Sequence, residues 1–317
     1  MKPLVTVICI SYNHAPFIKE AIESLFNQRY DNIEIIIADD ASTDESQAFL
    51  QSLISDKPEI KSIFHDSNIG YTKTFNEAFG LAQGKYIIDF ALDDVMLPDF
   101  VLRSVSQLEQ VGEDFGVSFS NANYIDAGSL TIGNHNGLLK AKGLMHDILS
   151  GDLFAFILRR YFICTPSMVM RKSVLDRLNG YDTSLAYEDF DFWVRSSRFT
   201  GYTYINDVLV NKRKLKNLMS SQQYDHRQNL QLESTLKVCN KALHLCKTKT
   251  ELNALADRVN FELRYCLTSG AFDLAREFLE LLKILKENSF RRLVYKTLLA
   301  LKMNYQFLNK SRKKGSF

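Results

Sequence analysis

Residues Lys85–Pro98 read KYIIDFALDDVMLP, an apolar run that ends in two adjacent aspartates, Asp93 and Asp94. Its first part, Lys85–Ala91, has the length and continuous apolar character of a strand buried in a parallel sheet. Pro98 is well placed in the first turn of a following helix. The pattern therefore predicts that the two carboxylates lie at the carboxyl end of a strand, just before a helix.

The same theme recurs upstream of this stretch. Apolar runs stand at LVTVICIS (4–11), IEIIIAD (33–39) and IKSIFH (60–65), and each is followed by apolar residues at helical spacing. Strands that alternate with helices predict an α/β fold with a mostly parallel sheet and flanking helices. Ligands bind such sheets outside the carboxyl ends of the strands. Ser11, Asp39 and Asp93 all fall at such ends.

The pattern becomes less regular after Phe115. We expect a strand at GVSFSNANYI (116–125), a Gly/Asn-rich loop over 126–143 and a further strand at GYTYIND (201–207). From about His226 the composition is helical, rich in Leu and Lys, and without proline. This change predicts two domains, 1–221 and a helical C-terminal extension over 222–317.

Composition limits the classes of function. The chain has 317 residues, 46% of them hydrophobic, and a formal net charge of +2, so no global field favours nucleic acid. Its five cysteines show no CxxC spacing, which is typical of a reduced, cytosolic protein. No apolar segment approaches the ~20 residues of a membrane span. We expect a cytoplasmic protein, either soluble or peripheral to the membrane.

Two acidic stretches have the chemistry of a site. Adjacent carboxylates repel each other, and a cation relieves that repulsion, so Asp93 and Asp94 are candidate metal ligands. The alternative is that acidic residues here only favour the helix begun at Pro98. Asp89 lies mid-strand and is either a further site carboxylate or a solvent-facing edge residue.

The second stretch is YEDFDFW (187–193), in which three acids stand among aromatic residues. Apolar surroundings raise the pKa of a carboxyl group and make it a better base toward a hydroxyl. The alternative is a helix N-terminus rich in acids, which its dipole favours. We interpret Trp193 as a core residue, with stacking on a sugar as the alternative.

Four segments in this order resemble the inverting, nucleotide-sugar-dependent glycosyltransferases of family 2, which have the GT-A fold, a Rossmann-like α/β fold. They are VTVICISYNHAPFIKEAIESLFNQ with IIIADDASTDES, NIGYTKTFNEAF, GKYIIDFALDDVMLPD and GYDTSLAYEDFDFWVR. The resemblance covers Pro3 to about Ser221. It implies an enzyme that moves a sugar from a nucleotide diphosphate to a hydroxyl of a glycan or a lipid-linked acceptor, in bacterial-type surface polysaccharide assembly.

The resemblance also implies roles for donor binding. Asp39 is expected to accept a hydrogen bond from the uracil or thymine ring N–H, which favours a UDP- or dTDP-linked sugar; capping the next helix is the alternative. Asp93 is assigned to the ribose and Asp94 to Mg²⁺ or Mn²⁺, with the order of the two left open. The other donor-binding positions expected are Ser11, Asn13, Asn68, Gly70, Asn76 and Lys216.

For catalysis, the resemblance implies Asp189 as the base that deprotonates the acceptor, with Glu188 orienting or binding that acceptor and Asp191 as the second candidate base. Three positions depart from the commoner family pattern, namely Ala91, Phe75 and the histidine-free segment that contains Lys214 and Lys216. These departures weaken the metal assignment and keep one alternative open, a noncatalytic nucleotide-sugar-binding module on the same fold. The other alternative is a nucleotidyltransferase, but the absence of a P-loop-type glycine-rich loop and the presence of YEDFDFW count against it.

The C-terminal tail has its own pattern. From Asn288 to Phe317 it carries eight basic residues and no acid, between apolar residues at helical spacing. Such a basic amphipathic helix can bind the anionic inner face of the cell membrane. The alternative is a helix packed on the rest of the protein with a basic end.

Overall fold

The computed structural model describes residues 2–143, 150–215, 230–286 and 288–301. The chain divides into two compact units, and each is described by itself. The first comprises 1–153, 162–184 and 196–216, and the second comprises 154–161, 185–195 and 217–317. The expected domain boundary at 221/222 falls outside the described residues and stays a prediction.

Within the described residues, nine strands of the first unit form one sheet. The order is β3-β2-β1-β4-β8-β6-β9-β5, with β7 paired to β6. The strands are β1 (Val5–Ser11), β2 (Ile33–Asp39), β3 (Lys61–Phe64), β4 (Tyr86–Ala91), β5 (Val95–Met96), β6 (Phe115–Ile125), β7 (Thr131–Asn134), β8 (Val169–Arg171) and β9 (Gly201–Arg213).

The sheet is parallel from β3 to β4 and mixed beyond it. β1 pairs in parallel with β2 and with β4, and β2 pairs in parallel with β3. β8 is antiparallel to both β4 and β6, whereas β6 and β9 are parallel. The parallel half brings the carboxyl ends of β2, β1 and β4 to one edge, as the strand–helix alternation predicts.

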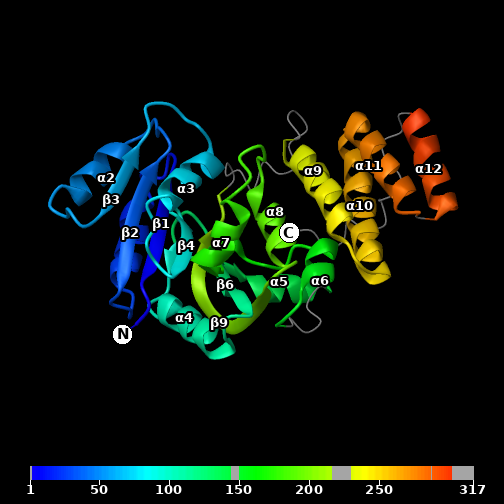
Figure 1. Ribbon diagram of the computed structural model, residues 1–317. Coiled ribbons are helices and arrows are strands. Elements are labelled where there is room, and N and C mark those ends of the chain that lie inside the picture. The colour runs from blue at the N-terminus through cyan, green and yellow to red at the C-terminus, as the bar shows by residue number, and fades with distance from the viewer. Residues whose placement is uncertain (1, 144–149, 216–229, 287, 302–317) are drawn as a thin grey trace. The chain divides into compact units, whose positions relative to one another are not determined.

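The helices of this unit lie between successive strands (Figure 1). They are α1 (Ile18–Phe26), α2 (Ser46–Ile54), α3 (Tyr71–Phe79), α4 (Phe100–Val111), α5 (His135–Ala141), the 3₁₀ turn η1 (Thr165–Ser167) and α7 (Lys172–Leu178). The expected loop over 126–143 is wrong, because β7 and α5 fill it. Asn134 caps α5 by accepting a hydrogen bond from the backbone N–H of Gly137.

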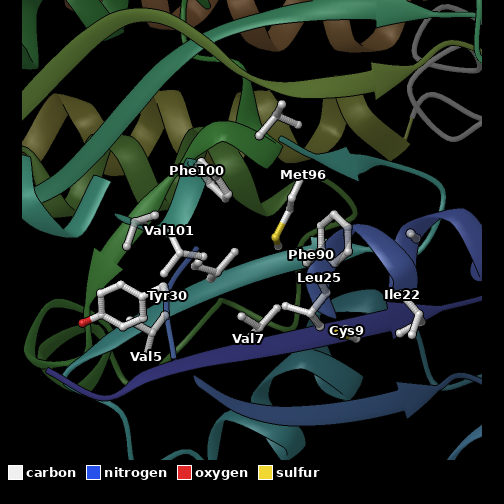
Figure 2. Packing of buried hydrophobic residues seen from close by; sticks show 14 of the residues in the cluster. Val5, Val7, Cys9, Ile22, Leu25, Tyr30, Phe90, Met96, Phe100 and Val101 are labelled. Atoms are coloured by element: carbon white, nitrogen blue, oxygen red, sulfur yellow. The ribbon is translucent and has the colours of Figure 1, made fainter. Parts of the chain in front are cut away.

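The core forms because β1 presents alternate residues to opposite faces. Val5, Val7 and Cys9 pack with residues of α1 and α4, as Figure 2 shows for Leu25 and Phe100. Ile8 is equally buried on the other face. There its register partner on β4, Asp89, accepts a hydrogen bond from Tyr71 of α3. Helices therefore cover both faces of the parallel half.

The second unit is helical. It comprises α6 (Phe154–Arg159), α8 (Glu188–Ser196, apart from its last residue), α9 (Leu230–Leu245), α10 (Lys249–Ser269), α11 (Phe272–Ile284) and α12 (Ser289–Ala300). α10 contacts α6, α9 and α11, and α12 packs on α11. A capping box at Thr248 and Glu251 begins α10, and Gly270 ends it with a left-handed φ of 80°. The predicted α/β fold with C-terminal helices is confirmed.

Candidate active site

Ser11 and Asp39 are register partners at the carboxyl ends of β1 and β2, and both are buried. Asp39 Oδ1 accepts from the backbone N–H of Ser42 at 2.8 Å, and Oδ2 accepts from the Ser42 hydroxyl at 2.6 Å. The backbone N–H of Ser46, the first residue of α2, instead donates to Asp44 at 3.0 Å. Asp39 thus orders the turn before α2 and does not cap the helix.

Asn13 connects the loops that follow β1 and β2. Its backbone is left-handed, with φ of 58°, and its N–H donates to the Ser42 hydroxyl oxygen at 2.8 Å. Its Oδ1 accepts from the backbone N–H of Thr43 at 2.8 Å. The Ser42 hydroxyl is therefore oriented by Asn13 on one side and donates to Asp39 on the other.

Asn68 and Gly70 gather around Asp40. The backbone N–H groups of Ile69 and Gly70 donate to the Asp40 carboxylate at 2.8 and 2.9 Å, and Asn68 Nδ2 donates to the Asp40 carbonyl at 3.2 Å. Gly70 has φ of 93°, which strongly favours glycine. The structure brings both residues to the turn after β2, where Asp40 holds them.

Asn76 has a different environment. Its Nδ2 donates to the Tyr181 carbonyl and its Oδ1 accepts from the Tyr181 N–H, both at 2.8 Å. Both ends of the amide thus tie α3 to the segment after α7, so we leave Asn76 out of the donor site. Asp89 lies on β4, a central strand of the sheet, and its carboxylate accepts hydrogen bonds from the hydroxyls of Tyr71 and Tyr181. The solvent-facing edge alternative for Asp89 is wrong.

Asp93 and Asp94 are both buried beyond the end of β4. Asp94 Oδ1 accepts from the backbone N–H of Arg213 at 2.7 Å. Burial raises the pKa of Asp94 well above its ordinary value, and the charge of Asp93 raises it further; Lys212 and Arg213 act in the opposite direction. Two buried, mutually repelling carboxylates are an arrangement that a bound cation stabilises.

Arg213 is the main residue that sequence reasoning missed. Its side chain is 0% exposed. The guanidinium donates to the carbonyls of Asp93 and Asp126 at 2.8 and 2.7 Å, and to Glu20 at 2.6 Å. From the sequence we expect a donor-binding role for Lys216 in this segment and none for Arg213. The only feature of the sequence that could have indicated Arg213 is its position between Lys212 and Lys214 at the end of the strand.

Three basic side chains, those of two lysines and a histidine, lie near the aspartate pair. The Lys212 charge acts on Asp94, and the Lys214 ammonium lies 4.5 Å from the centre of the Tyr124 ring, also within the field of Asp94. His14 Nε2 lies 4.0 Å from Asp93 Oδ1. Lys216, the predicted phosphate contact, lies outside the described residues.

The carboxylates fit a hard divalent cation. Among the described residues, no hydrogen-bond donor occupies Asp94 Oδ2 or either Asp93 carboxylate oxygen. The described chain holds no cluster of three or more metal-ligating side chains. Mg²⁺ and Mn²⁺ commonly take one or two protein carboxylates and complete their shell with phosphate oxygens and water. The donor set here suits that mode of binding.

The predicted catalytic acids lie at the start of α8, in the second unit. Asp189 and Asp191 are buried and Glu188 is partly exposed. Asp191 accepts from Arg195 Nε at 2.6 Å and from Lys241 Nζ at 2.7 Å. Trp193 is buried beside Tyr161, so its interpretation as a core residue is confirmed.

Known structures share this fold over nearly the whole chain. One match is TarS 1–349 from S. aureus in complex with UDP-GlcNAc. The match covers 99% of the present chain and 93% of that chain, with a TM-score of 0.71 and 16% identity. The present chain likewise superposes on the mannosyltransferase PcManGT from Pyrobaculum calidifontis in complex with GDP-Man and Mn²⁺, with a TM-score of 0.60, 16% identity and 89% of that chain covered. These likenesses establish the GT-A fold.

Sequence relatives are glycosyltransferases. The chain is 29% identical, over 72% of its length and 70% of the relative's, to an uncharacterised glycosyltransferase of Haemophilus influenzae. It is 24% identical to chondroitin synthase of Escherichia coli over 76% of its own length but only 33% of that protein. The profile described as Glycosyl transferase family 2 matches residues 6–178, more than half of the chain. The protein is therefore a glycosyltransferase and belongs to glycosyl transferase family 2.

Proposed function

We propose that the protein transfers a sugar, with inversion, from a UDP- or dTDP-sugar to a hydroxyl of a glycan or lipid-linked acceptor. Surface polysaccharide synthesis is the process that such an acceptor implies. The proposal rests above all on the edge where β2, β1 and β4 end side by side, since Asp39 is the last residue of β2, and Asp93 and Asp94 follow the end of β4. A nucleotide diphosphate laid across these strand ends would place its base at Asp39 and its phosphates near the aspartate pair.

Asp39 would recognise the base by accepting a hydrogen bond from its ring N–H in place of the one from Ser42. In the free protein the Ser42 hydroxyl donates to Asp39 Oδ2. A uracil or thymine ring N–H is a donor of the same kind and would replace that hydroxyl on the carboxylate. Guanine places its ring donors differently, and cytosine presents an acceptor at the equivalent ring nitrogen. The UDP-GlcNAc complex of TarS agrees with a uridine donor for this fold.

Charged side chains from several elements would bind the diphosphate, either directly or through a cation. Asp94 would hold Mg²⁺ or Mn²⁺, and Asp93 would contact the ribose or share the cation. The cation, when bound, supplies positive charge to the phosphate oxygens of the leaving group. Lys212 and Lys214 neutralise the same diphosphate, and Arg213 fixes the aspartate turn through the Asp93 carbonyl and the Asp94 carboxylate. The Mn²⁺ of the PcManGT complex agrees with a divalent cation.

Asp189 would act as the base. It stands at the first turn of α8, where the helix N-terminus favours a carboxylate. Taking the proton from the acceptor hydroxyl lets its oxygen attack the anomeric carbon directly, and one such displacement inverts the configuration. Glu188, partly exposed beside it, would orient the acceptor.

A lipid-linked acceptor would require the protein to work at a membrane surface. No helix among the described residues is long and apolar enough to cross a membrane. α12 and the next residue, Leu301, instead expose an apolar stripe, with Phe290 at 72%, Leu293 and Leu301 at 61% and Val294 at 37%. Arg291, Arg292 and Lys296 accompany this stripe on the same helix. This favours peripheral binding to an anionic cytoplasmic membrane face; Lys302 and the later basic residues lie outside the described residues.

Two matched substitutions test the proposed function in the full chain. Asp94→Asn should weaken the Mn²⁺-dependent binding of UDP as well as turnover, because it removes the charge that holds the cation. Asp189→Asn should leave UDP binding intact and lower turnover by roughly a hundredfold or more, the usual scale of lost general-base catalysis. The measurements are calorimetric titration of UDP with and without Mn²⁺ and release of nucleoside diphosphate.

The two variants control for each other, since both replace a buried aspartate by an amide of the same size. Wild-type turnover in Asp189→Asn would place the base elsewhere. An unaltered Mn²⁺ response in Asp94→Asn would mean that the aspartate pair does not bind the cation and that the lysines handle the phosphates.

A further inference from the structure

The first turn of α8 is connected to α9 by an ion pair between Asp191 and Lys241. Asp191 is only 1% exposed, and its two oxygens accept from different cations. Oδ2 accepts from Arg195 Nε at 2.6 Å, within the same helix, and Oδ1 accepts from Lys241 Nζ at 2.7 Å, from α9. With both oxygens occupied and its charge balanced, Asp191 is unsuited to act as the base. Its connection to Lys241 instead anchors α8.

A second connection joins α9 to the segment just before α8. The backbone N–H of Ala186 donates to the Ser234 hydroxyl oxygen at 2.9 Å. Ser234 and Lys241 are seven residues apart on α9, close to two helical turns, so they lie on the same face. α9 therefore contacts the chain on both sides of Asp189 and restricts the position of that residue.

α10 provides a third connection through Arg258. This buried guanidinium lies 3.9 Å from the ring centre of Tyr161 and 5.0 Å from that of Phe190, the residue after Asp189. Its Nε donates to the Leu158 carbonyl at 3.0 Å, and Glu262 balances its charge at 3.1 Å. Cation–π contacts of a desolvated guanidinium are among the stronger of their kind. α10 thereby fixes the first turn of α8 from another side.

We propose that the C-terminal helices hold the catalytic helix in place, with Lys241 as the positioning residue that acts on Asp189 through Asp191. This inference rests on the proposed role of Asp189 as the base. Because a base must stand within hydrogen-bond reach of the acceptor proton, a displacement of about 1 Å can lower turnover by roughly a hundredfold. Arg195 cannot replace Lys241, since it belongs to α8 and moves with it. The C-terminal extension is thus part of the catalytic apparatus.

The test uses three variants of the full chain. Lys241→Met removes the ammonium and keeps a long apolar stem, and Lys241→Arg keeps a cation at the same place. Lys283→Met is the matched control, because its ammonium pairs with Glu280 at 3.1 Å on the exposed surface of α11 in the same unit. Each variant is assayed for the kcat and donor KM of the active UDP-sugar, and for hydrogen exchange of the amides over 186–196.

We expect Lys241→Met to lower kcat about tenfold to a hundredfold, with the donor KM changed less than about twofold. Exchange over 186–196 should become faster in this variant. Lys241→Arg should restore most of both properties, and Lys283→Met should match the wild type. This split between kcat and KM would not follow from a general loss of stability.

Wild-type kcat with unchanged exchange over 186–196 in Lys241→Met would overturn the inference. A joint loss of kcat and donor affinity that Lys241→Arg does not restore would overturn it as well, since it would indicate general unfolding. Wild-type turnover in Asp189→Asn would reject the proposed base instead. In that case the exchange measurement alone still decides whether Lys241 holds α8, because it requires no activity.

Discussion

Replacing Asp39 by alanine should remove the ability of the protein to distinguish UDP from CDP. Uracil carries a ring N–H at the position where cytosine carries an acceptor lone pair. The wild-type carboxylate should therefore bind the first base and repel the second. In Asp39→Ala the uracil N–H loses its acceptor, and a buried donor without a partner costs about 1–3 kcal/mol. That cost corresponds to a roughly five- to 150-fold weaker affinity for UDP.

Ser42 supplies the matched control. Its hydroxyl occupies Asp39 Oδ2 in the free protein at 2.6 Å and must leave when the base binds. Ser42→Ala removes this competitor, whose hydrogen bond contributes about 0.5–1.5 kcal/mol, so UDP should bind about two- to tenfold more tightly. The two substitutions thus change the UDP affinity in opposite directions, although they remove the two partners of one hydrogen bond.

Isothermal titration of UDP and CDP against the wild type and both variants measures these effects. The ratio of the two affinities is the decisive quantity, because a distortion of the loop after β2 would weaken both nucleotides alike. We expect a ratio of about ten or more in the wild type and in Ser42→Ala, and near one in Asp39→Ala. A folded Asp39→Ala protein that keeps the wild-type ratio would refute base recognition by this residue.

Three further predictions concern stability and the membrane. Burial lowers the pKa of His65, but its hydrogen bonds to two carboxylates raise it more, to a net value above the ordinary one. The stability of the wild type relative to His65→Gln should therefore be greatest below about pH 6.5 and fall as the pH rises through the folded-state pKa, in urea denaturation. Gly180→Ala should cost roughly 2–4 kcal/mol of unfolding free energy, since φ is 74° and the new Cβ would lie 2.3 Å from Asn76 Oδ1; a loss below about 0.5 kcal/mol would contradict this. Replacing both Phe290 and Leu293 by serine should abolish cosedimentation with anionic vesicles at low salt without changing UDP affinity, and equal binding would favour α12 as a purely packed helix.

Features that depend on residues close together in the sequence could be predicted from the sequence alone. The strands that end at Ser11, Asp39 and Ala91 were evident because a buried parallel strand requires a continuous apolar run, and the following turn requires polar residues. The edge with Asp39 and Asp93 follows, since parallel strands joined through helices present their carboxyl ends on one side. The region 126–143 was mistaken for a loop, because its Gly/Asn composition concealed a strand that exists only by pairing with β6.

Contacts between distant parts of the chain required the tertiary structure. An arginine is expected on the surface from the sequence alone. Arg213 is nevertheless buried, because backbone carbonyls and the Glu20 carboxylate from other parts of the fold accept its hydrogen bonds. Asn76 matched a donor-site position, but its amide binds the backbone of Tyr181. The YEDFDFW stretch marked the acids of α8. Only folding decided that Asp191 would be neutralised by Lys241, because an ion pair depends on which side chains packing brings within a few ångströms.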